Sequence, residues 1–135
     1  SPRGLRTDGA TSIFAAVDRE LAPWGVSAAQ GSILVYIAHG RGNRAADIAR
    51  DYDYDTGSMT RMVARLAAKR LLRRVPDDTD RRVQRLELTA AGKKLTEQMA
   101  AMAAKVLNHH LRGVSRAELD QMKALLNRML ENGRG

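Results

Sequence analysis

Apolar side chains recur at every third or fourth position over most of the chain, the spacing that places them on one face of a helix. The first such stretch covers residues 11–21. A second follows Ser27 to Gln30, a capping box in which the serine caps the helix and the glutamine reaches back to it, and ends at Gly40. Residues 45–51 predict a short third helix.

The fourth predicted helix begins behind Asp55, a residue type that caps helix N-termini, and runs from Thr56 to about Lys69. Its apolar face consists of Met59, Met62, Val63 and Leu66. The opposite face carries small hydroxyls and arginines. The turn "YDYD" joins this helix to the third, so this part of the chain predicts two helices joined by a short turn.

After Lys69 the period of the pattern changes from that of a helix to that of a strand. Residues 71–75 and 83–88 have strand composition, and the second of these stretches alternates in polarity. The proline and aspartates between them are turn-forming residues. The sequence therefore predicts a β-hairpin within an otherwise helical chain.

Two further helices are predicted after the hairpin. The first is capped by Thr89, runs from about Ala90 to Leu111 and has a regular seam formed by Leu95, Met99, Met102, Val106 and His109. The second follows Gly113 and the capping box Ser115 to Glu118, and its apolar stripe is Leu119, Met122, Leu126 and Met129. So late in the chain, little is left to cover this stripe, and we expect its partner on a second subunit.

The composition limits the possible classes of protein. The chain has 135 residues, enough for one domain, and 44% of them are hydrophobic. It has no cysteine, which excludes disulfides, thiolate metal sites and thiol-based sensing. No run approaches the roughly 20 apolar residues that span a bilayer, and the N-terminus lacks a signal-like apolar stretch, so we expect a cytoplasmic protein without membrane contact.

The net charge of +8 is concentrated in one region. Between Arg61 and Arg85 there are nine Lys or Arg residues and three Asp residues, a local charge of +6. Such a region is either a solvated basic face or a surface that binds a polyanion. The choice depends on what these residues fold into.

The order of elements is that of a winged helix-turn-helix with a dimerisation helix at each end, and the residues resemble one family. The stretch "DIARDYDYDTGSMTRMVARLAAKRLLRRVPDDTDRRVQRLELTAAGKKL" is similar to the core of the MarR (multiple antibiotic resistance regulator) family of bacterial transcription factors. The features that match are "IA", "SMTR" with "RL" behind it, "DRR" and "LTAAG". The stretch "WGVSAAQGSILVYIA" is similar more weakly. One departure is Arg70, where the family usually has glycine, so the end of the fourth helix would need a left-handed non-glycine residue.

The resemblance implies a mainly α fold with a small β-hairpin, in a single domain over residues 1–135. The winged helix-turn-helix lobe would cover about 27–89, and the dimerisation helices about 5–22 and 90–132. The implied function is that of a sequence-specific transcriptional regulator, a homodimeric repressor of a pseudopalindromic double-stranded DNA operator. Family members are commonly released from DNA by a small aromatic or phenolic ligand. No cofactor is implied.

The fourth predicted helix would enter the major groove of DNA, with its N-terminal side chains at the base edges. The short side chains suited to phosphate or a thymine methyl are Thr56, Ser58 and Thr60. Arg61 can reach guanine with two hydrogen bonds, whereas Arg65, one turn later, suits phosphate or an intramolecular pair.

The hairpin would be the wing. By family resemblance Arg82 enters the minor groove and Asp80 orients it, an arrangement that favours narrow A·T-rich tracts. The other wing arginines, Arg73, Arg74, Arg81 and Arg85, are candidates for phosphate contact or for intramolecular pairing. Asp77 and Asp78 are expected to form the bend.

Candidate ligand-binding residues are Arg6, Trp24, Tyr36 and His39, with His109 and His110 as further possibilities. Each has a structural alternative: Trp24 as a core anchor, Tyr36 on a packed helix, His39 as a cation at a helix C-terminus, and the two neighbouring histidines as surface or seam residues. With three histidines and no cysteine, we expect no metal site.

Two other functions compete with DNA binding. A winged helix can serve as a protein-interaction module, with the basic hairpin meeting an acidic partner. An enzyme is the third class, but the sequence contains no nucleophile elbow, phosphate loop or metal-ligand spacing. We therefore expect no enzymatic activity.

Overall fold

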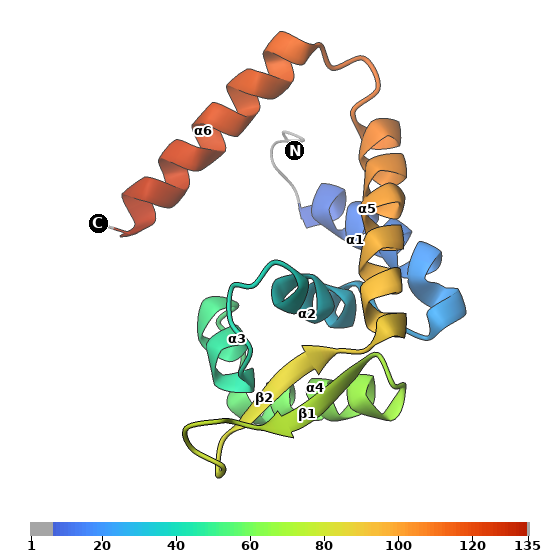
Figure 1. Ribbon diagram of the computed structural model, residues 1–135. Helices are drawn as coiled ribbons and strands as arrows, with labels where there is room; N and C mark the ends of the chain where they lie inside the picture. The colour runs from blue at the N-terminus through green and yellow to red at the C-terminus, as the bar shows by residue number, and fades with distance from the viewer. Residues whose placement is uncertain (1–6, 135) are drawn as a thin grey trace.

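The computed structural model describes residues 7–134, with side chains from Ile13 onward. In chain order the elements are α1 (Thr7–Leu21), the 3-10 turn η1 (Ala22–Trp24), α2 (Ala28–Ala38), α3 (Ala45–Asp51), α4 (Thr56–Ala68), β1 (Leu72–Pro76), β2 (Gln84–Leu88), α5 (Ala90–His110) and α6 (Arg116–Arg134) (Figure 1). The expected fold class, mainly helical with one antiparallel hairpin, is confirmed.

The predicted helix caps form as hydrogen bonds. Ser27 Oγ accepts from the Gln30 amide at 3.1 Å, and Gln30 Oε1 accepts from the Ser27 amide at 3.2 Å. Ser115 and Glu118 form the same reciprocal pair at the start of α6. Thr89 Oγ1 accepts from the amide of the third residue of α5 at 3.0 Å. These bonds satisfy backbone donors that the first turn of a helix leaves free.

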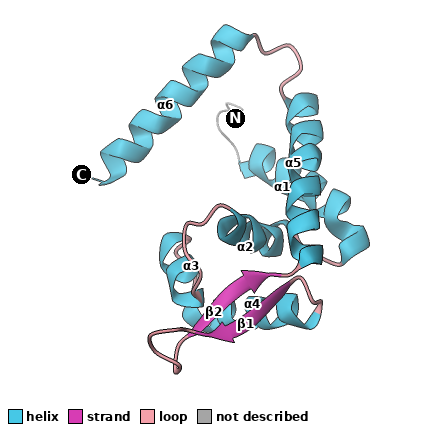
Figure 2. Cartoon of the chain, in the orientation of Figure 1, coloured by secondary structure: helices cyan, strands magenta, loops and turns pink. Residues whose placement is uncertain are grey.

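The core lies between α2, α3, α4 and the hairpin. Its fully buried side chains include Ile33, Leu34, Ile48, Met59, Leu66 and Leu72. Figure 2 shows the two strands side by side below α2, with α4 behind them. Leu72 is paired with Leu88, and Pro76 with Gln84. The predicted strand bounds were within one residue of those observed.

The hairpin is also tied to the loop that precedes α3. The backbone amide of Leu86 in β2 donates to the carbonyl of Asn43 at 2.6 Å. At the other end of the hairpin, Arg70 has a φ of 59°, the left-handed conformation that the departure from glycine implied. Thr89 Oγ1 donates to the Arg70 carbonyl at 2.7 Å, so the end of α4 and the start of α5 are joined.

Gly92 of α5 lies against the backbone just before the start of β1. A Cβ at this position would overlap the carbonyl oxygen of Leu71. That oxygen already accepts a hydrogen bond from the Thr89 amide at 3.2 Å, so it has little freedom to move. The glycine of "LTAAG" is therefore required by the close approach of two backbones.

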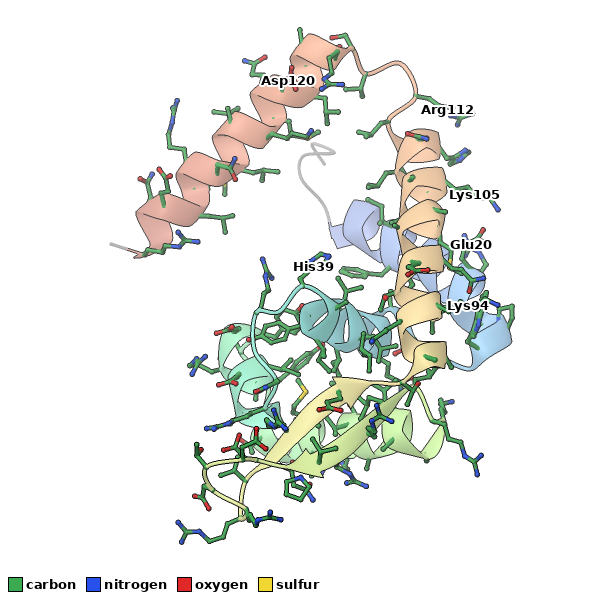
Figure 3. The ribbon with its side chains drawn as sticks, in the orientation of Figure 1. Glu20, His39, Lys94, Lys105, Arg112 and Asp120 are labelled. Atoms are coloured by element: carbon green, nitrogen blue, oxygen red, sulfur yellow. The ribbon has the colours of Figure 1, made fainter. Side chains whose placement is uncertain are left out.

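The long helix α5 packs against α1 and α2. Leu95 and Val106 of its predicted seam are buried and Met99 and Met102 are partly buried, but His109 is exposed. Lys105 Nζ donates to Glu20 Oε1 of α1 at 2.8 Å (Figure 3). By contrast, α6 extends away from the lobe, and none of its described residues is buried (Figure 1).

Across residues 7–134, no single helix has both the length and the apolar content needed to cross a membrane. The segments Ile13–Trp24 and Ala28–Ala38 pass that test only when taken together, and they are bent by 80°.

Candidate nucleic-acid interface

Helix α4 separates its apolar and polar side chains cleanly. Met59, Val63 and Leu66 are buried, whereas Thr56, Thr60, Arg61 and Arg65 are exposed and Ser58 is half-buried. The helix begins at Asp55, whose Oδ2 accepts from the Ser58 amide at 2.9 Å. This backbone hydrogen bond lowers the pKa of the Asp55 carboxyl, so the cap stays charged.

The polar face of α4 is partly ordered by its own contacts. Arg61 Nη2 donates to Ser58 Oγ at 3.1 Å, and Thr60 Oγ1 donates to the Thr56 carbonyl at 2.9 Å. Arg65 has no ion pair with any of the side chains that the structure describes. Its guanidinium is therefore available at the surface, one turn beyond Arg61.

At the tip of the wing, Asp80 and Arg82 form a two-point contact. Arg82 Nε donates to Asp80 Oδ1 at 3.0 Å and Nη2 donates to Oδ2 at 3.2 Å. The Arg82 amide also donates to Oδ1, at 3.1 Å. The Arg82 side chain nevertheless remains 91% exposed. The contact from the Arg82 side chain lowers the pKa of the Asp80 carboxyl, and the guanidinium is oriented while it still faces solvent.

The other wing arginines divide into two groups. Arg73 pairs with Glu87 across the hairpin at 3.4 Å. Arg85 is half-buried and lies 3.6 Å from Asp78, with longer contacts to Asp77 and Glu87. Arg74 and Arg81 are exposed and have no ion pair within the described part of the chain. Arg73 and Arg85 therefore pair within the chain. Arg74 and Arg81 remain candidates for phosphate contact.

Asp77 and Asp78, the two aspartates of the predicted bend, lie in different environments. Asp77 is 7% exposed, and its side chain accepts hydrogen bonds from the backbone of Thr79 and Asp80. Asp78 has a side chain that is 84% exposed and is paired with Arg85. The order "DDT" signals an Asx-type turn at Asp77, but it gives no sign that this carboxylate is buried.

The candidate ligand residues do not meet in one cavity. Trp24 is 38% exposed and is not a core anchor. Tyr36 is fully buried, and its hydroxyl donates to Asp51 Oδ2 at 2.6 Å. This hydrogen bond, with burial, raises the pKa of Tyr36 to about 12. His39 is exposed at the end of α2 (Figure 3), and Arg6 lies outside the described residues.

His109 and His110 are stacked edge to face, with ring centroids 5.6 Å apart. They line a shallow hollow of about 350 Å³ with Glu20 and Lys105 of the α1–α5 contact. Among the described residues, no group of three or more His, Cys, Asp or Glu side chains is arranged to hold a metal ion.

A larger cavity, which the sequence did not reveal, lies between α1, the start of α2 and the turn before α4. Its volume is about 550 Å³, and it is lined by Phe14, Asp18, Ser27, Ala28, Ala29, Ser32, Tyr52 and Tyr54. Tyr52 donates to the Ser32 carbonyl at 3.3 Å and stacks edge to face on both Tyr36 and Tyr54. The pattern "YDYD" predicts only a turn, because the contact of its tyrosines with α1 depends on tertiary packing.

Comparison with known proteins agrees with this geometry. The model of the MarR family matches residues 24–83. The multiple antibiotic resistance protein MarR of Escherichia coli (strain K12) is 27% identical over 111 residues, which cover 82% of this chain and 77% of that protein.

Solved structures share the fold. The S. aureus MepR–DNA complex is 26% identical and covers 91% of each chain, with a TM-score of 0.79. CouR from Rhodococcus jostii RHA1, bound to p-coumaroyl-CoA, is 22% identical, with a TM-score of 0.78, and the match covers 91% of this chain and 87% of that chain. The winged helix-turn-helix, the "SMTR" and "DRR" segments and these matches together support a MarR family transcription regulator.

Proposed function

We propose that this protein is a homodimeric repressor that binds a pseudopalindromic operator and is released from it by a small aromatic ligand. The observation that carries the proposal is the pairing of an exposed, hydroxyl- and arginine-bearing face on α4 with a solvent-facing Arg82 that Asp80 already orients. One protein of the same fold, S. aureus MepR, has been solved in complex with DNA.

In this proposal α4 lies in the major groove, which is wide enough for one helix. Thr56, Ser58 and Thr60 approach closely because their side chains are short. Arg61 turns from Ser58 to a base edge, where a guanidinium suits the two acceptors of guanine. Arg65, which has no ion pair within the described residues, binds phosphate.

The wing then enters the adjacent minor groove through Arg82. A guanidinium that is already oriented loses less side-chain entropy when it binds, so the Asp80 contact favours association. Arg74 and Arg81 bind the flanking phosphates, because they are exposed and free of carboxylate partners within residues 13–134. Arg73 and Arg85 stabilise the hairpin instead.

The dimer is supported by the apolar stripe on α6. Met122, Leu125, Leu126, Met129 and Leu130 are between 41% and 67% exposed on one helix. A contiguous apolar surface of this kind is rarely left open to water in a soluble protein. A two-fold partner would cover it and would place two α4 helices about one turn of DNA apart.

The cavity beside α1 is the proposed ligand site. Its volume of about 550 Å³ is in the range of small-molecule pockets, and Phe14, Tyr52 and Tyr54 provide aromatic surface. Tyr54 directly precedes Asp55, the residue that caps α4. A planar ligand that displaces Tyr54 would therefore disturb the start of the recognition helix. This cavity replaces the dispersed set of Trp24, Tyr36 and His39 as the ligand site.

The test is a binding titration of the full chain with a palindromic DNA fragment from upstream of its own gene, with a scrambled fragment as the control. We expect tighter binding to the palindrome and a log–log salt slope of about 0.9 for each phosphate neutralised. Equal binding to both fragments would contradict an operator-specific repressor. Absence of any salt-dependent binding would favour the protein-interaction module instead.

A further inference from the structure

Asp77 is the one buried charged residue in the described part of the chain, although it belongs to the wing loop. This loop is closed by two backbone hydrogen bonds. The Asp77 amide donates to the Val83 carbonyl at 2.8 Å, and the Val83 amide donates to the Asp80 carbonyl at 2.9 Å. A buried carboxylate is costly unless it is paired and hydrogen-bonded, so its partners indicate what it does.

The two carboxylate oxygens of Asp77 have different partners. Oδ2 accepts from the Thr79 amide at 3.2 Å, the Thr79 hydroxyl at 2.6 Å and the Asp80 amide at 3.2 Å. Oδ1 faces arginines from two other segments, Arg44 Nη2 at 3.4 Å and Arg85 Nε at 3.9 Å. The first oxygen therefore shapes the loop, and the second joins the loop to the body of the lobe.

The contacts of Asp77 with the Asp80 amide and with Arg44 connect it to two elements of the proposed DNA-binding surface, the wing tip and the helix-turn-helix. The bond to the Asp80 amide fixes the backbone from which Asp80 holds Arg82. Arg44 immediately precedes α3, the first helix of the helix-turn-helix. One carboxylate thus connects the wing tip with the start of the helix-turn-helix.

The hydrogen bond from the Thr79 hydroxyl, followed by those from the backbone of residues 79 and 80, lowers the pKa of the Asp77 carboxyl to about 2. The neighbouring Asp78 lacks this environment. Its side chain is 84% exposed, and its one ion pair within the described residues is with Arg85. The two aspartates thus offer a matched comparison of the same charge in the same loop.

We propose that Asp77 is a positioning residue for DNA recognition, which sets the wing loop so that Asp80 presents Arg82 and holds that loop at a fixed place relative to the helix-turn-helix. The inference rests on the proposed DNA binding, but its first consequence is a property of the free protein. Asp77 itself does not contact DNA, because its carboxylate is buried and both of its oxygens face groups of the chain itself.

The first experiment measures the order of the Arg82 side chain without DNA, from the ¹H–¹⁵N heteronuclear NOE of its Nε–H group in the full chain. Asp77→Ala and Asp80→Ala should both lower this NOE toward that of a free arginine side chain. Asp78→Ala should leave it unchanged. An Arg82 side chain that is as ordered in Asp77→Ala as in the wild type would overturn the proposal.

The second experiment is a double-mutant cycle on operator affinity. Asp77→Ala should weaken operator binding about three- to tenfold, because the wing loop and Arg82 would then become ordered only when DNA binds. In an Arg82→Ala background the same substitution should cost less than about twofold, because the group it positions is gone. An equal loss in both backgrounds would show that Asp77 acts independently of Arg82. Asp78→Ala controls for the change in net charge.

Asp77→Asn is the control for misfolding of the alanine variant. Its amide oxygen can still accept hydrogen bonds from the Thr79 and Asp80 amides, but the side chain has no charge to pair with Arg44. We expect this variant to keep most of the Arg82 order. If the wild-type protein binds no operator, the proposed function fails, whereas the NOE comparison still decides whether Asp77 orders Arg82.

Discussion

Asp80 holds the guanidinium of Arg82 at two points, yet the arginine side chain remains 91% exposed. Exposed ion pairs contribute little to stability, with typical values below about 1 kcal/mol. The pair is thus poorly explained as a stabilising contact. It is better explained as the orientation of a cation toward a partner outside the chain.

Replacing Arg82 with alanine should weaken operator binding by about 1–3 kcal/mol. The fold should not change, because the Arg82 side chain is 91% exposed and its hydrogen bonds are confined to Asp80 in the same loop. Binding is measured by mobility-shift titration, and folding by circular dichroism. Arg73→Ala removes the same charge from an arginine that already pairs with Glu87, and should cost less. Unchanged affinity in Arg82→Ala would remove the wing from the mechanism.

Replacing Arg70 with glycine should stabilise the protein. Arg70 has a φ of 59°, which costs a residue with a Cβ about 1–2 kcal/mol, partly offset by the greater freedom of glycine in the unfolded chain. We expect a net gain of about 0.5–1 kcal/mol in the free energy of unfolding, measured with urea. Ala68→Gly, in the last turn of α4, should lose about as much. A loss in both variants would argue against strain at Arg70.

Replacing Gly92 with alanine should destabilise the lobe by about 1–3 kcal/mol, because the added Cβ would overlap the Leu71 carbonyl oxygen. The same substitution at Gly133, which has nothing within 4 Å of an added Cβ, is the matched control. That variant should be neutral or slightly more stable, since alanine favours the helix. Thermal unfolding of the two variants side by side gives the comparison, and equal melting temperatures would count against the close approach.

Placing charges in the apolar stripe of α6 should dissociate the dimer. Leu126→Asp combined with Met129→Asp puts two carboxylates where a partner helix would pack, at side chains that are 52% and 67% exposed in the single chain. Sedimentation should then report a monomer, as it should for a chain that ends before Gly113. Asn127→Asp places a charge outside the apolar stripe and should remain dimeric. A dimer that persists in the double variant would move the interface away from α6.

Filling the cavity beside α1 should abolish the effect of an aromatic effector. The probes are 2-hydroxybenzoate and 4-hydroxycinnamate, and the readout is the rise in melting temperature that a bound ligand produces. Ala29→Phe fills this cavity, whereas Ala103→Phe fills the separate hollow between α2 and α5. We expect the rise to disappear only in Ala29→Phe. Its loss only in Ala103→Phe would place the ligand site beside α5.

The sequence alone determined the features that depend on neighbouring residues. Ser27 with Gln30, Asp55 with Ser58, and Thr89 with Gly92 are caps three residues apart, and each forms as expected. Such pairs meet as soon as the backbone turns, whatever surrounds them. The change of period after Lys69 located both strands for the same reason.

Tertiary structure decided where distant segments meet. Asp77 is buried and faces Arg44, from the loop before α3, and two adjacent aspartates give no sign of which one will be covered. The cavity beside α1 joins Phe14 to Tyr54, which lie on opposite sides of α2 and α3 in the sequence. Trp24, Tyr36 and His39 looked equally suited to a ligand, yet they are exposed, buried and exposed, respectively. Burial and cavities come from the packing of whole elements, whose relative placement is not encoded in the spacing of nearby residues.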